Sequence, residues 1–202
     1  MAKQFGNWKQ QAVIEGHAMN AQVGTLSTPI QGGGAGTILV IDEPQATISV
    51  PTGTAILLMK VRVDCQVPLL ATDADEIEIV LAIDRAAAVA DGTATAETPL
   101  NMRTDLNTSL LGVTTAPTVK SAYTVAMTDP VLTYELAHPV KVGDVQTAVG
   151  TTWTKLGLDY DPEFSSAIVG PATVIVYWGG TVAVTGFANL TYAAYNTTDL
   201  TT

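Results

Sequence analysis

Histidine and cysteine, the side chains that most often bring metal ions or nucleophiles into a site, are scarce in this chain. Its two histidines, His17 and His138, are far apart in the sequence, whereas a metal site on a β scaffold needs several such ligands around one ion. The single cysteine, Cys65, lies on the apolar side of a predicted strand, where a thiol is usually an inert core residue. We therefore expect no metal site, no cofactor site and no nucleophilic catalysis from these residues.

Carboxylates are the other residues that could do chemistry, because calcium prefers oxygen ligands. They gather in two runs, which comprise Asp73, Asp75, Glu76 and Glu78, and then Asp159, Asp161 and Glu163. Neither run has the glycine and the terminal glutamate of an EF-hand loop. Carboxylates that form turns or face solvent explain both runs, and calcium binding remains open as an alternative.

Motifs for catalysis and for phosphate binding are also missing from the sequence. It contains no Gly-x-Ser-x-Gly elbow, no P-loop and no dinucleotide fingerprint. The glycine-rich residues 32–36 lack the lysine and the strand-to-helix context of an anion-binding loop. We interpret these residues as a hinge and expect that the protein is not an enzyme.

Charge and composition narrow the range of partners. Nine basic residues stand against 19 acidic ones, and the resulting net charge of -10 repels phosphate backbones and anionic membrane surfaces. No apolar run approaches the roughly 18 residues of a membrane span. We therefore expect neither nucleic acid nor a membrane as a partner. Because only 14% of the residues are charged while 47% are hydrophobic, we expect that other protein subunits cover part of the surface.

The elements that would have to position any site are β-strands. In residues 54–67, apolar side chains at odd positions alternate with polar ones at even positions from Lys60 onwards, which predicts a core face and a wet face. Residues 172–178 are apolar on both faces, so this strand should lie inside a sheet or be covered by another subunit. The dipeptide at 179–180 is Gly-Gly, which predicts a tight hairpin to residues 181–195.

Strand patterning recurs along the chain with turn residues between the segments. The nine candidate strands are residues 37–41, 46–50, 54–67, 76–84, 121–127, 131–138, 151–158, 172–178 and 181–195. Together with the long connections, they predict an all-β fold, a jelly-roll-like antiparallel β-sandwich over residues 31–202. Residues 1–30 are interpreted as an extended N-terminal arm before the hinge. A first strand followed by a flexible loop fits the same residues equally well.

Several short motifs, in order along most of the chain, resemble small virion proteins of tailed bacteriophages. They are Phe5-Gly6-Asn7-Trp8 with Glu15-Gly16-His17, Thr98-Pro99-Leu100-Asn101-Met102-Arg103, and Gly170-Pro171-Ala172. The resemblance implies a structural capsid protein, commonly a head decoration or cement protein, often a homotrimer with a jelly-roll-like fold. It implies the major capsid protein and further copies of the chain as partners, the outer capsid surface as the location, and no active site.

Two sets of residues are expected to touch these partners. Phe5, Trp8 and His17 belong to the arm, which would dock onto the shell, and Tyr177 and Trp178 belong to the apolar strand that would join subunits. The alternative function is a carbohydrate-binding β-sandwich, such as a fibre or adhesin domain. It would hold glycans with exposed aromatic side chains and acidic turns.

Overall fold

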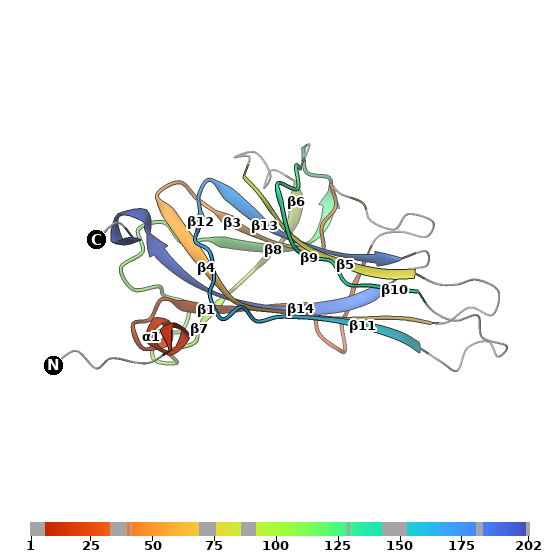
Figure 1. Ribbon diagram of the computed structural model, residues 1–202, viewed down its shortest axis with the longest axis horizontal. Coiled ribbons are helices and arrows are strands. Elements are labelled where there is room, and N and C mark those ends of the chain that lie inside the picture. The colour runs from red at the N-terminus through yellow and green to blue at the C-terminus, as the bar shows by residue number, and fades with distance from the viewer. Residues whose placement is uncertain are drawn as a thin grey trace.

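The chain folds as two antiparallel β-sheets packed face to face. A computed structural model describes residues 7–32, 40, 42–68, 76–85, 92–128, 130–142, 153–180 and 184–200. The two sheets form separate layers, with helix α1 on the outer side of one of them (Figure 1). The predicted all-β sandwich is therefore confirmed. No helix in these residues is long and apolar enough to cross a bilayer.

The elements of the described residues follow in chain order. They are α1 (Trp8–Ile14), β1 (Ala18–Val23), β2 (Ile30–Gln31), β3 (Ala46–Val50), β4 (Thr54–Pro68), β5 (Glu76–Asp84), β6 (Thr93–Glu97), β7 (Leu100–Asn101), β8 (Thr118–Val125), β9 (Tyr134–Ala137), β10 (Val140–Val142), β11 (Trp153–Tyr160), β12 (Ile168–Val169), β13 (Ala172–Gly180), β14 (Thr185–Asn196) and the 3-10 helix η1 (Thr197–Leu200). The predicted strand over 37–41 lies almost entirely outside the described residues.

Each sheet combines strands from distant parts of the chain. Sheet A has the order β11-β4-β14-β1-β7, with β12 paired to β4 and β2 paired to β14. Sheet B has the order β10-β5-β13-β3-β8-β6, with β9 paired to β5. Among the described strands, no two that pair with each other are consecutive in the chain.

Strand β13 lies inside sheet B, between β5 and β3, and all nine of its residues are buried. Val174, Val176 and Trp178 point into the core between the sheets. Ile175 and Tyr177 point to the other face, where they form a second apolar cluster with residues of the segment after β8. The predicted interior position is confirmed, and the chain itself provides the cover on both faces. Burial also raises the pKa of the Tyr177 hydroxyl.

The predicted hairpin between residues 172–178 and 181–195 is wrong. Strand β13 pairs with β3 and β5 in sheet B, whereas β14 pairs with β1, β2 and β4 in sheet A. Gly180 is still part of the ladder, opposite Ile77, and a Cβ on it would lie 2.1 Å from the carbonyl oxygen of Glu76. The glycine therefore permits close packing of two strands instead of a tight turn.

The alternation predicted for β4 holds for only part of the strand. Thr191 pairs with Lys60 and Tyr192 with Leu58, so Met59 is the extra residue of a β-bulge. After the bulge, Val61, Val63 and Cys65 face the core, as expected. Before it the core residues are Ile56 and Leu58, so the odd-numbered residues face outwards. One extra residue reverses which side chains point inwards.

The interpretation of residues 1–30 as an extended arm is wrong for the residues that the structure describes. Strand β1 pairs along its whole length with β14 inside sheet A, and its Met19, Ala21 and Val23 lie in the core. Helix α1 packs its buried Ala12 against the outer face of the same sheet. The alternative, a first strand, is the correct one for these residues.

Cys65 has the environment expected of an inert core residue. Its side chain is 3% exposed and belongs to the main apolar cluster. Burial in these apolar surroundings raises the pKa of the thiol, so the reactive thiolate is disfavoured.

Candidate binding surfaces

The outer face of sheet A positions polar side chains in rows across three strands. One row consists of Lys155 on β11, Gln66 on β4 and Thr185 on β14. The next consists of Gly157, Asp64 and Phe187, and the third of Asp159, Arg62 and Asn189. Because residues paired across neighbouring strands lie side by side on one face, each row brings three distant parts of the chain together.

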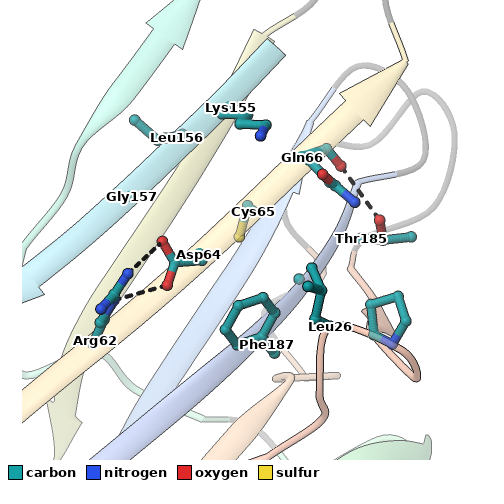
Figure 2. Close-up of a pocket in the computed structure, with 12 residues that line it drawn as sticks. Leu26, Arg62, Asp64, Cys65, Gln66, Lys155, Leu156, Gly157, Thr185 and Phe187 are labelled. Carbon is teal, nitrogen blue, oxygen red and sulfur yellow. Dashed lines mark hydrogen bonds and ion pairs between the residues drawn. The ribbon is translucent and has the colours of Figure 1, made fainter. Parts of the chain in front are cut away.

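The first two rows and Arg62 of the third line a hollow of about 260 Å³, which we call the trough. Six of the residues that line it are Leu26, Asp64, Gln66, Lys155, Gly157 and Phe187. Figure 2 shows the ring of Phe187 between Asp64 and Leu26, with Gln66 and Thr185 on one side of it and Lys155 on the neighbouring strand. The trough therefore has an apolar side at Phe187 and Leu26 and a polar side formed by β4 and β11.

Gly157 creates the open space on the β11 side of the trough. It is opposite Asp64 on the outer face of an edge strand, where any other residue would place a side chain over the neighbouring carboxylate. A Cβ at this position would lie 3.7 Å from the carbonyl oxygen of Val63 and 3.8 Å from Oδ1 of Asp64. Both are ordinary contact distances, so a side chain here would fill the trough without straining the strand.

Some polar side chains of this face form hydrogen bonds within the protein, and others do not. Near β1, the amides of Asn20 and Asn189 bind each other at 2.7 and 3.1 Å, and Asn189 also donates to Gln22. In the trough, by contrast, the Gln66 side-chain amide and the Lys155 ammonium have no hydrogen-bond partner within the described part of the chain. These groups are available to a ligand.

The loop between β1 and β2 contributes Leu26 to the apolar side of the trough, and local hydrogen bonds fix its conformation. The backbone N–H of Thr28 donates to Oγ1 of Thr25 at 3.0 Å, and the N–H of Thr25 donates to the carbonyl oxygen of Thr28. Leu26, at the tip of this turn, is 76% exposed. The turn thus holds a large apolar side chain in solvent beside Phe187 (Figure 2).

A second candidate, the α1 surface, consists of Asn7, Trp8, Lys9, Asp161, Glu163 and Phe164. Asn7 caps the helix by accepting a hydrogen bond from the backbone N–H of Lys9 at 2.9 Å. The indole N–H of Trp8 donates to the carbonyl oxygen of Glu163 at 2.8 Å. Phe164 is 84% exposed, the highest value among the exposed large apolar side chains of the described residues. An aromatic ring is thus held in solvent beside the helix.

Ion pairs connect α1 to the outer face of sheet A. Lys9 pairs with Asp161, and Lys60 of β4 lies 3.0 Å from Asp159 and 3.7 Å from Asp161. The hydrogen bond from Lys9 holds the pKa of the Asp161 carboxyl below its ordinary value, and the bond to Asp159 raises the pKa of Lys60. Two carboxylates of the second acidic run, Asp159 and Asp161, therefore form ion pairs, and the pair with Lys9 holds the helix against the sheet.

The predicted partner-binding residues are not gathered in one place. Trp8 lies on the α1 surface, and Phe5 lies outside the described residues. His17 is half-buried, with its ring 4.5 Å from that of Tyr195, and it lines neither candidate surface.

The expectation that Tyr177 and Trp178 bind a partner is wrong for the folded chain, because their side chains are 1% and 0% exposed. The sequence correctly indicated a strand covered on both faces, but it could not show that Tyr123, Met127 and Leu132 of the same chain pack against Tyr177. The residues missed by the sequence analysis are Phe164 and Phe187, which lie alone in their segments without a recognisable motif.

Potential metal ligands are dispersed in the part of the chain that the structure describes. Within the described ranges, no three His, Cys, Asp or Glu residues lie close enough together to hold a metal ion. Asp73 and Asp75 of the first acidic run fall outside these ranges. His138 contacts Glu78 at 2.8 Å, in keeping with a structural role. Comparison with known protein families gives no match, and comparison with curated proteins gives none either.

Proposed function

We propose that this chain is a non-enzymatic virion structural protein, a decoration or cement protein that binds and stabilises the capsid of a tailed bacteriophage. The phage assignment rests on the sequence motifs that resemble small virion proteins. An all-β sandwich with a strongly acidic composition suits an outer position, away from packaged DNA. The α1 surface is the proposed site of attachment to the major capsid protein.

The observation that supports this attachment site is the exposure of Phe164 beside Trp8. Aromatic residues contribute strongly to protein interfaces, because they bury a large area with few rotatable bonds. Around them, Asn7, Lys9 and Asp161 supply the polar rim that such interfaces usually have. The ion pairs and the Trp8 hydrogen bond fix the helix before binding, which reduces the entropy that docking would cost.

Attachment is tested by rebinding the purified chain to particles from its natural source that have been stripped of it. We expect Phe164→Ala to weaken co-sedimentation with these particles by about tenfold or more, because a central aromatic contact is lost. Phe187→Ala, an equivalent change in the trough, serves as the matched control and should rebind normally. If wild type and Phe164→Ala rebind equally well, the α1 surface is not the site of attachment to the capsid.

Self-association is the second part of the proposal, with a homotrimer as the expected form. It is supported by four exposed apolar side chains near the edge strand β7, which we call the β7 patch: Ile14, Leu100, Met102 and Leu111. Hydrogen bonds bring their segments together, since Met102 N–H donates to Ala18 and Leu111 N–H donates to Gly16. Such a concentration at a sheet edge is typical of subunit contacts.

Light scattering of the purified protein measures the number of chains in the oligomer. We expect a mass of three chains for the wild type and of one chain for the double variant Leu100→Glu, Met102→Glu, because the new charges oppose burial of the patch. Leu26→Glu, at the trough, is the control and should keep the mass of the wild type. A monomeric wild type at high concentration would contradict the proposed oligomer.

The alternative function, a carbohydrate-binding β-sandwich, is favoured by one specific observation, the combination of Phe187 with unpaired polar groups in the trough. Three other aromatic side chains of the two sheets, Tyr177, Trp178 and Tyr192, are buried and do not support a sugar site. The trough can nevertheless coexist with attachment to a particle, because its residues are distinct from those of the α1 surface.

A further inference from the structure

We propose that the trough on the outer face of sheet A binds one pyranose ring of a neutral glycan. The inference does not depend on the virion assignment, since it rests only on the residues around the hollow. Its volume of about 260 Å³ is below the roughly 300–1,000 Å³ typical of pockets for drug-sized ligands. A site of this size accommodates a single ring or the end of a chain.

The apolar side of the trough matches one face of a sugar ring. A pyranose presents C–H groups on one face and hydroxyl groups around its edge, so it binds best where an aromatic ring adjoins polar side chains. Phe187 is directly opposite Asp64 in the strand pairing, and Leu26 extends the apolar side (Figure 2). The space in front of Asp64 is open because Gly157 has no side chain.

The polar side offers both kinds of hydrogen-bonding group that hydroxyls require. Sugar hydroxyls donate and accept, and the trough contains the Asp64 carboxylate as an acceptor, the Lys155 ammonium as a donor, and the Gln66 amide as both. The last two have no partner in the described part of the chain, unlike the mutually bonded amides of Asn20 and Asn189. A ligand can therefore bind them without breaking hydrogen bonds inside the protein.

Charge favours a neutral ligand over an anionic one. Arg62 donates to Asp64 at 2.8 Å, so these two charges largely compensate each other and Lys155 remains as one cation. The net charge of -10 repels a polyanion approaching from solution. Nucleic acids and acidic polysaccharides are thus disfavoured, and hydrogen bonding to hydroxyls is the main attraction available.

The backbone positions that carry these groups are fixed before a ligand binds. Asp64, Gln66, Gly157, Thr185 and Phe187 lie on paired strands, and the hydrogen-bonded Thr25–Thr28 turn holds Leu26. Sites on regular elements lose little conformational freedom when a ligand binds, which compensates for the few contacts that one ring can make.

Saturation-transfer NMR and titration calorimetry with maltohexaose, laminarihexaose and chitohexaose test the proposal on the full chain. We expect at least one of these neutral oligosaccharides to bind, with an affinity that changes less than about twofold between about 50 and about 500 mM salt. Phe187→Ala removes the apolar side and should weaken binding at least about tenfold. Gly157→Val should have an equal effect, because its Cβ meets its neighbours at ordinary contact distances and its methyl groups would occupy the hollow.

Phe164→Ala is the matched control, since it removes an exposed phenylalanine outside the trough and should leave sugar binding unchanged. Far-UV circular dichroism confirms that each variant is folded. The proposal is overturned if no neutral oligosaccharide binds, if Gly157→Val binds as well as wild type, or if only polygalacturonate or DNA binds and does so with a steep salt dependence. Phe187→Ala should still rebind to stripped particles. A loss of sugar binding in this variant can therefore be distinguished from a failure of capsid attachment.

Discussion

Replacing Trp178 with alanine is expected to lower the free energy of unfolding by about 3–5 kcal/mol, as for other buried tryptophans. The side chain is 0% exposed and lies in the core between the two sheets. Its indole N–H donates to the carbonyl oxygen of Ile30 at 3.2 Å, so the substitution removes both apolar contacts and a hydrogen bond that links the sheets. Because domains are stable by only about 5–15 kcal/mol, chemical denaturation should show a large shift of the midpoint.

A second, milder variant keeps this prediction testable if Trp178→Ala does not fold. Trp178→Phe retains most of the apolar volume and should lose less stability than the alanine variant. Phe164→Ala is the exposed control and should stay within about 0.5 kcal/mol of the wild type. If Trp178→Ala were as stable as the wild type but no longer formed the oligomer, Trp178 would be a contact between subunits, as the sequence predicted.

Gly32→Ala is expected to destabilise the protein by about 1–3 kcal/mol through overpacking. A Cβ on Gly32 would lie 2.1 Å from the carbonyl oxygen of Trp178 and 2.7 Å from its Cδ1 atom. The backbone N–H of Gly32 is also bonded to the carbonyl oxygen of Val184 at 2.7 Å, which limits how far the residue can move. Thermal denaturation measures the effect.

The matched control is Gly157→Ala, whose added Cβ meets its nearest neighbours at ordinary contact distances. This variant should be within about 0.5 kcal/mol of the wild type, since the position is exposed. If both variants melted alike, Gly32 would not be tightly packed, and its interpretation as the start of a hinge would regain support.

The strands themselves could largely be predicted from the sequence, since strand periodicity is a local property. Residues 46–50 and 76–84 coincide with β3 and β5, and the two-sided apolar pattern of 172–178 correctly indicated an interior strand. The face of each residue was less predictable. In β4 the bulge at Met59 reverses the alternation, and no feature of the sequence marks the position at which one strand holds an extra residue.

Strand pairing could not be predicted, because it depends on contacts between distant parts of the chain. The Gly179-Gly180 pair is compatible with a hairpin and with close packing in a ladder, and only the position of Glu76 decides between them. The same limit applies to the binding surfaces. The trough depends on the register that aligns Gly157, Asp64 and Phe187 from three strands, and none of these residues is distinctive alone.

Electron cryomicroscopy of intact particles from the natural source tests the proposed virion function most directly. We expect density for this β-sandwich on the outer capsid surface, grouped around threefold positions, with α1 and Phe164 against the major capsid protein and the trough facing solvent. Particles that lack the chain, or that hold it inside the shell against the packaged DNA, would contradict the proposed function.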